Sequence, residues 1–76
     1  MIDLDNLRML RHKKKMTQLA LQMKTGINQT VLSKYERNER LPSVDQLAIL
    51  AEFFNTSIDY LVGLTDVQQP YPRKGK

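Results

Sequence analysis

The spacing of nonpolar residues is the feature of this sequence that most constrains its fold. Nonpolar residues recur at intervals of three and four along most of the chain, and no run of four or more residues alternates between nonpolar and polar. Such a period is typical of helices that bury one face, whereas strands of a half-buried sheet alternate. The pattern therefore predicts an all-α protein without strands.

Capping residues and glycines divide this pattern into five helices. Residues with side-chain oxygens are preferred N-caps because they accept hydrogen bonds from the free N–H groups of the first turn. The expected N-caps, in chain order, are Asp5, Thr17, Asn28, Ser43 and either Thr56 or Ser57. Ser43 and Gln46 form a Ser-x-x-Gln capping box, and Gly26 and Gly63 are placed to end the second and fifth helices. The second and third helices are expected to end near Lys24 and Glu36.

The nonpolar faces of these helices predict the core. In the fourth helix, Leu47, Leu50, Ala51 and Phe54 form one stripe at helical spacing. The other helices contribute the remaining expected core residues, which are Leu7, Leu10, Leu21, Ile27, Leu32, Ile58, Leu61 and Val62.

Length and composition exclude several classes of protein. The chain has 76 residues and no cysteine, which excludes disulfides and cysteine-ligated metal centres and fits a reducing cytosolic setting. No nonpolar run approaches the roughly 18 residues of a membrane span, and the acidic start does not resemble a signal peptide. We expect one domain over residues 1–66 and an extended basic, proline-containing tail over residues 67–76.

Charge is distributed unevenly along the chain. Residues 8–40 contain nine basic and two acidic residues, whereas residues 41–66 contain four acidic residues and no basic one. A domain with one strongly basic side presents the electrostatic footprint of phosphate binding, although charge clustering alone also occurs on solvated surfaces that bind nothing.

Two short helices joined by a glycine-containing turn form the central motif, over about residues 17–36. A helix-turn-helix requires a tight turn and a nonpolar face that holds its two helices at a fixed angle. The run from Met16 to Ser43 resembles the phage-repressor (Cro-type, or XRE) helix-turn-helix family, as does the segment from Ser57 to Asp66. The shared anchors are Thr17-Gln18, Gly26, Ser33-Lys34-Tyr35-Glu36 and Pro42-Ser43, in the family's order and spacing.

This resemblance implies a compact five-helix domain of the lambda-repressor-like fold that binds double-stranded DNA as a dimer on a palindromic operator. It places the third helix in the major groove, with base contacts from Gln29, Thr30, Ser33 and Lys34. It also places Gln18 on a phosphate at the start of the second helix. The chemistry agrees, since Gln pairs with adenine, Lys donates to guanine, and a Thr methyl packs on thymine.

Further site residues follow from their positions beside the motif. The other expected phosphate contacts are Arg11, Asn28, Arg37, Asn38 and Arg40. Dimerisation is expected through the fifth helix and the residue after it, with Tyr60, Leu61, Leu64 and Val67, although Tyr60 and Leu64 would equally fit an intramolecular core.

The sequence departs from the family pattern at several positions. Gln22 replaces a small residue where the two helices approach closely, so we expect a slightly opened crossing. Thr25 replaces a nonpolar residue, and Lys15 replaces a helix-ending glycine. Leu19 and Met23 lie four residues apart on the expected outer face of the second helix. They either pack on the first helix or on the stem of Lys24, or form a patch for a protein partner.

These features favour a sequence-specific transcriptional regulator, most simply a repressor, without a cofactor or a metal. The alternative is an antitoxin or another protein-interaction module of the same fold. An enzyme is not expected, because the chain has one histidine, no cysteine nucleophile and no glycine-rich phosphate loop. The expected location is the cytoplasm of a bacterium or a phage host, on the nucleoid when bound to DNA.

Overall fold

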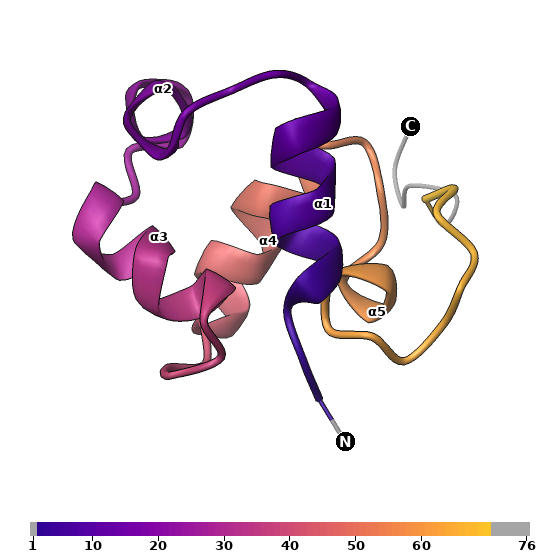
Figure 1. Cartoon of the computed structure of the whole chain (residues 1–76). Helices are drawn as coiled ribbons and strands as arrows, with labels where there is room; N and C mark the ends of the chain where they lie inside the picture. Colours follow the sequence, from indigo (N-terminus) through magenta and orange to yellow (C-terminus); the bar gives the residue numbers. More distant parts are fainter. Residues whose placement is uncertain (1, 71–76) are drawn as a thin grey trace.

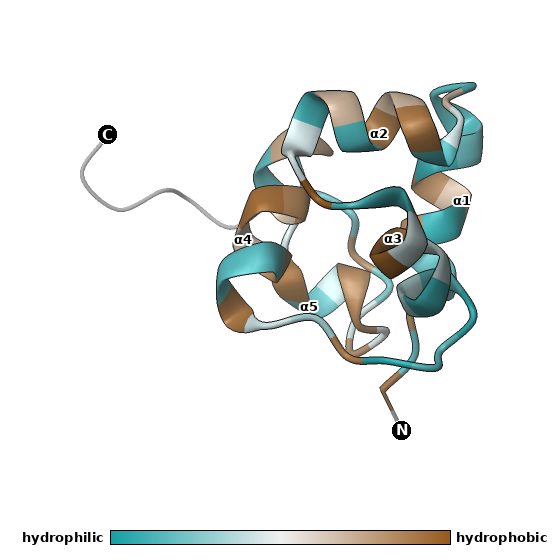
Figure 2. Cartoon of the chain, turned by 90° about the vertical axis from the view of Figure 1, so that its left-hand side faces the viewer, coloured by the Kyte–Doolittle hydropathy of each residue, from teal (hydrophilic) through white to brown (hydrophobic). Residues whose placement is uncertain are grey.

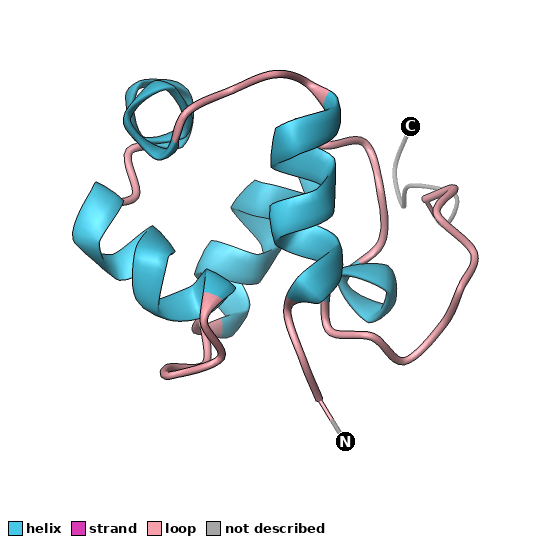
Figure 3. Cartoon of the chain, viewed as in Figure 1, coloured by secondary structure: helices cyan, strands magenta, loops and turns pink. Residues whose placement is uncertain are grey.

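The computed structural model describes residues 2–70 and contains five helices and no strand in that range (Figures 1 and 3). The all-α prediction is confirmed. The helices are α1 (Asp5–Lys13), α2 (Gln18–Thr25), α3 (Gln29–Glu36), α4 (Val44–Phe53) and α5 (Ile58–Leu61). Helices α2 and α3 are neighbours at one side of the molecule, and α1 packs against both α3 and α5 (Figure 1).

Four of the expected N-caps are confirmed. The side-chain oxygens of Thr17, Asn28, Ser43 and Ser57 each accept a hydrogen bond from a backbone N–H in the first turn, at 2.7–3.2 Å. The prediction for Asp5 is wrong, because Asp5 is the first helical residue and Leu4 is the N-cap. The carboxylate of Asp3 accepts from the Asp5 N–H at 3.1 Å, so the chain uses an acid two positions earlier.

The core is built from nonpolar residues of all five helices, and hydrophilic and hydrophobic residues alternate along each helix as its faces turn in and out (Figure 2). The stripe predicted in α4 is confirmed, because Leu50, Ala51 and Phe54 are buried and Leu47 packs partly buried against them. Burial of a leucine side chain contributes about 1.5–3 kcal/mol. The fully buried leucines are Leu4, Leu7, Leu21, Leu32, Leu50 and Leu61.

Among the residues that the structure describes, three other than glycine have left-handed backbone conformations, and each follows a helix. Lys15, Asn38 and Asn55 have φ of 57°, 59° and 54°. Asparagine tolerates this conformation, whereas a lysine is strained by about 1–2 kcal/mol. The expectation that Lys15 occupies a glycine-like position is therefore confirmed.

None of the helices within residues 2–70 has both the length and the nonpolar character needed to cross a bilayer.

We expect Lys15→Gly to stabilise the protein by about 1 kcal/mol, because glycine adopts a positive φ without the Cβ clash. Thermal unfolding followed by circular dichroism checks this, and the midpoint should rise by about 4–8 °C for a domain of this size. The matched control is Lys13→Gly, at the last residue of α1, which should not stabilise the protein and should destabilise it by up to about 1 kcal/mol because glycine is a poor helix former. A lowered midpoint for Lys15→Gly would contradict backbone strain at this position.

Candidate nucleic-acid interface

Helices α2 and α3 are held together by a small nonpolar contact. Leu21 from α2, Ile27 from the turn and Leu32 from α3 are buried at 0%, 4% and 0% exposure, as the motif predicts. Gly26 ends α2 with φ of 79°, and its N–H donates to the Gln22 carbonyl at 2.8 Å. A Cβ at Gly26 would meet no atom within 4 Å, so glycine is required there for its backbone conformation and not for space.

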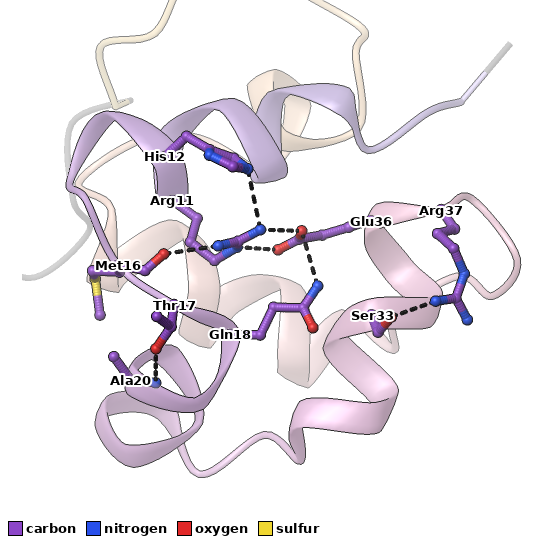
Figure 4. A network of polar contacts seen from close by, with 9 residues as sticks. All are labelled: Arg11, His12, Met16, Thr17, Gln18, Ala20, Ser33, Glu36 and Arg37. Carbon is purple, nitrogen blue, oxygen red and sulfur yellow. Dashed lines mark hydrogen bonds and ion pairs between the residues drawn. The ribbon is translucent and has the colours of Figure 1, made fainter.

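The outer face of α3 presents the expected base-contacting residues to solvent. Gln29, Thr30 and Lys34 are exposed, whereas Ser33 is only half-exposed. The Ser33 hydroxyl accepts a hydrogen bond from the Arg37 guanidinium at 2.6 Å (Figure 4). Three of the four side chains are therefore exposed to solvent, and Ser33 is hydrogen-bonded to Arg37, the C-cap of α3.

A buried ion pair joins α1 to the end of α3. The Arg11 guanidinium donates to both carboxylate oxygens of Glu36, at 2.7 and 2.8 Å, and also to the Met16 carbonyl at 2.7 Å (Figure 4). The side chains of the pair are 10% and 3% exposed. The hydrogen bond to Glu36 raises the pKa of Arg11 further above its already high value, so Arg11 stays charged.

The expected phosphate contact of Arg11 is corrected by this geometry. Its guanidinium is committed to Glu36 and Met16 inside the molecule, where it organises the motif instead of facing a ligand. Sequence analysis missed Glu36 as its partner, because 25 residues separate the two and no local pattern links them.

Gln18 joins the same network from the start of α2. Its amide donates to Glu36 at 3.2 Å, so α2 and α1 both contact the last residue of α3 (Figure 4). Gln18 is half-buried at this position.

Asn38 also makes contacts within the molecule. Its side-chain oxygen accepts from the Leu4 N–H at 2.7 Å, and its amide nitrogen lies 3.4 Å from the Asp5 carboxylate. The side chain thus fastens the loop after α3 to the start of α1. Asn38 itself is exposed, so a phosphate contact from its amide remains a prediction.

The remaining phosphate candidates lie on the surface. Asn28, Arg37 and Arg40 are exposed. Asn28 uses its oxygen as the N-cap of α3, and Arg37 pairs with Glu39 at 2.9 Å. This pairing lowers the pKa of Glu39 and raises that of Arg37. Both acids of the basic segment, Glu36 and Glu39, are therefore neutralised by arginines.

The expected dimer residues divide into two groups. Tyr60 and Leu61 are 6% and 0% exposed, so the structure corrects their assignment and places them in the core. Leu64 and Val67 are 62% and 61% exposed and remain available to a second molecule. Within α5, Tyr60 and Leu61 are buried and Ile58 and Asp59 are half-buried, so the exposed nonpolar residues of this region lie after the helix.

Leu19 and Met23 lie on the surface of α2. They are 51% and 78% exposed on α2, so the structure favours the surface patch over internal packing.

The two polar departures from the family pattern both contact the turn. The Gln22 side-chain oxygen accepts from the Gln29 N–H at 2.7 Å, and the Thr25 hydroxyl accepts from the Ile27 N–H at 3.2 Å. Gln22 therefore folds toward α3 and binds it where the two helices approach each other. Its importance was missed, although a polar residue at a position of close approach was a usable signal.

Within the described residues, no three His, Cys, Asp or Glu side chains gather as metal ligands would.

A family model described as helix-turn-helix matches residues 7–61, and the chain belongs to this family of DNA-binding regulators. The resemblance inferred from the sequence is confirmed.

Relatives and a solved structure extend this assignment. The chain is 41% identical over 64 residues to the uncharacterized HTH-type transcriptional regulator YobD of Bacillus subtilis (strain 168), covering 84% of this chain and 57% of that protein. It is 35% identical to the HTH-type transcriptional regulator AnsR of the same organism, over 95% of this chain and 62% of AnsR. For the HTH-type transcriptional regulator ImmR, also from B. subtilis, identity is 39% over 78% of this chain and 46% of ImmR.

The chain thus spans about half the length of the curated relatives it matches. In structure it is similar to the P22 c2 repressor protein, solved in complex with a synthetic operator. That match has a TM-score of 0.75 and 31% identity, and covers 80% of this chain and 92% of the repressor chain.

We expect Glu36→Ala to destabilise the protein by about 3–5 kcal/mol, because it leaves the buried Arg11 charge without its partner. Urea unfolding measures this loss. Since such a loss is close to the whole stability of a small domain, a second variant combining Arg11→Met with Glu36→Leu should recover most of it. Glu39→Ala, at the exposed pair, is the control and should change the unfolding free energy very little. Equal effects of the two glutamate substitutions would contradict the role of the buried pair.

Proposed function

We propose that this chain is a sequence-specific transcriptional repressor that binds double-stranded DNA with α3 in the major groove. The observation that supports this most directly is the outer face of α3, where Gln29, Thr30 and Lys34 are exposed on a short helix held rigidly from behind. Family membership and the likeness to a repressor bound to an operator support the same function. The chain is accordingly a binding protein and not an enzyme.

The exposed side chains suit the edges of bases. The Gln29 amide both donates and accepts, which matches adenine, and the Lys34 ammonium donates to the acceptors of guanine. The Thr30 methyl packs on the methyl group of thymine. Ser33 contributes less in this proposal because its hydroxyl is already bonded to Arg37.

We expect the DNA phosphates to be bound by exposed basic side chains and by the start of α2. Arg40 is exposed in the loop after α3, and Lys13, Lys14 and Lys15 are exposed after α1. The N-terminus of α2 offers backbone N–H groups that favour an anion, beside the second amide proton of Gln18. Because both acids of the basic segment are paired with arginines, the other seven basic residues dominate the potential of this side.

The repressor is proposed to act as a dimer on a palindrome, with Leu64 and Val67 contributing to the contact between copies. Both are exposed nonpolar residues just after α5. Two-fold symmetry would place the half-sites about 34 Å apart, which is one turn of DNA. The proposed location is the cytoplasm, where bacterial DNA lies.

A second candidate function is binding of a regulatory protein, as in an antitoxin. The exposure of Leu19 and Met23 favours it. Two nonpolar side chains four residues apart are neighbours on the surface of a helix, so together they form a small nonpolar patch. Salt separates the two functions, because DNA binding weakens steeply as salt rises whereas a nonpolar contact responds little.

We expect selection from a random duplex library to recover a palindrome, and Gln29→Ala to lose about 1–3 kcal/mol of discrimination at one base pair. Arg40→Ala should weaken binding to all sequences similarly and reduce the slope of log affinity against log salt by about one. Fluorescence titrations with selected and random duplexes measure both effects. Equal losses of Gln29→Ala on the two duplexes would contradict base recognition by Gln29.

We expect Leu64→Glu to convert a dimer into a monomer without unfolding it, because the residue is exposed and the new charge repels its copy across the interface. Sedimentation velocity gives the mass, and circular dichroism monitors folding. Leu41→Glu, at another exposed nonpolar residue, is the control and should leave the mass unchanged. A wild-type protein that stays monomeric at micromolar concentration and on its operator would exclude the dimer.

A further inference from the structure

The first residue of the recognition helix is held by a side chain from the helix before it. The Gln22 oxygen accepts from the Gln29 N–H at 2.7 Å. This N–H belongs to the first turn of α3 and has no acceptor within the helix. Gln29 is also the exposed residue at the leading end of the proposed base-contacting face.

A second glutamine of α2 holds the other end of the same helix. The Gln18 amide donates to Glu36, the last residue of α3, at 3.2 Å. Gln18 and Gln22 are four residues apart, so both lie on the face of α2 that meets α3. The two glutamines therefore bind α3 at its first and last residues, on either side of the nonpolar contact between Leu21 and Leu32.

Side-chain acceptors also occupy the N–H groups on both sides of Gln29. The Thr25 hydroxyl accepts from Ile27 at 3.2 Å, and the Asn28 oxygen accepts from Thr30 at 2.7 Å. The Thr25 hydroxyl itself donates to the Leu21 carbonyl at 2.8 Å, which fixes its orientation. The turn is thus held by directional bonds, and the bond from Gln22 is the one that reaches Gln29 itself.

We propose that Gln22 is a positioning residue that determines base specificity by fixing the backbone of Gln29. Nonpolar contacts set the distance between α2 and α3 but permit small rotations, whereas a hydrogen bond is directional. A side-chain amide discriminates between base edges only when it is held to within about 0.5 Å of its productive position. The inference rests on the proposed function, because Gln22 can affect base specificity only if α3 contacts base pairs.

Two substitutions separate this role from simple packing. Gln22→Met keeps the length of the side chain and removes the carbonyl oxygen, so the Gln29 N–H loses its acceptor. Gln22→Glu keeps an acceptor, which the N-terminus of α3 favours, and removes the amide protons. If the acceptor matters, Gln22→Glu should keep the protection of the Gln29 amide and the discrimination between duplexes, and Gln22→Met should lose both.

The first measurement needs no DNA. Amide hydrogen exchange followed by NMR should show the Gln29 N–H exchanging about threefold to tenfold faster in Gln22→Met than in the wild type, as expected for loss of one hydrogen bond. Protection of the Leu32 and Tyr35 amides, inside α3, should not change. In Gln22→Glu the Gln29 amide should stay protected. Unchanged exchange at Gln29 in the methionine variant would overturn the inference.

The second measurement is discrimination between duplexes. The base pair contacted by Gln29 is defined as the one at which Gln29→Ala loses discrimination. At that pair Gln22→Met should lose about threefold to tenfold in the affinity ratio of correct to incorrect duplex, while discrimination at the pair contacted by Lys34 and the salt slope stay unchanged. Gln22→Glu should bind all duplexes more weakly because of its charge, yet keep the ratio.

The outcomes distinguish the inference from the function on which it rests. A wild-type protein that prefers no sequence over random DNA overturns the proposed function and the specificity role with it. A wild type that discriminates, together with a Gln22→Met variant that discriminates equally well or loses equally at every base pair, overturns the role of Gln22 alone.

Discussion

The arrangement of the motif depends on the buried ion pair between Arg11 and Glu36. Its carboxylate accepts from α1 and α2 while belonging to α3, and its guanidinium also holds the Met16 carbonyl in the connection from α1 to α2. Two charges with 10% and 3% exposed side chains would be costly if separated, but together with their further hydrogen bonds they have few alternative positions. This one contact therefore joins α1, α2 and α3, whose relative positions determine where the side chains of α3 point.

The fold was largely predictable because its signals are local. An N-cap such as Thr17 or Ser43 is recognised from its own position and the few residues after it, and the stripe of α4 lies within a few helical turns. Asp5 shows the limit of this approach, because the neighbouring Asp3 bonds to the same first turn and a shift of two residues decides which acid is used.

The site was predictable only in part, because its remaining features depend on contacts between distant residues. Arg11 and Asn38 are basic or polar residues beside the motif, and nothing local separates a phosphate ligand from an internal partner. In the structure, Arg11 bonds to Glu36, 25 residues away, and Asn38 bonds to the Leu4 N–H, 34 residues away. Tyr60 similarly looks amphipathic in sequence but is buried, since its surroundings come from other helices. By contrast, Gln29, Thr30 and Lys34 were placed correctly on the exposed face of α3, because the helical period alone fixes that face.

The segment before α1 and the first turn of α1 are hydrogen-bonded to α5 and the residue after it. The Asp3 N–H donates to the Val62 carbonyl at 3.2 Å, and the Asn6 amide donates to the Tyr60 carbonyl at 2.8 Å. During synthesis on a ribosome, the segment leading into α1 thus emerges before the other helices of this domain but completes its contacts only after α5 has appeared. Loop closure over more than 50 residues is entropically costly and has to be repaid by these late contacts. A nascent chain accordingly contains α3 well before it contains α5, and the domain can close as one unit only once α5 has been synthesised.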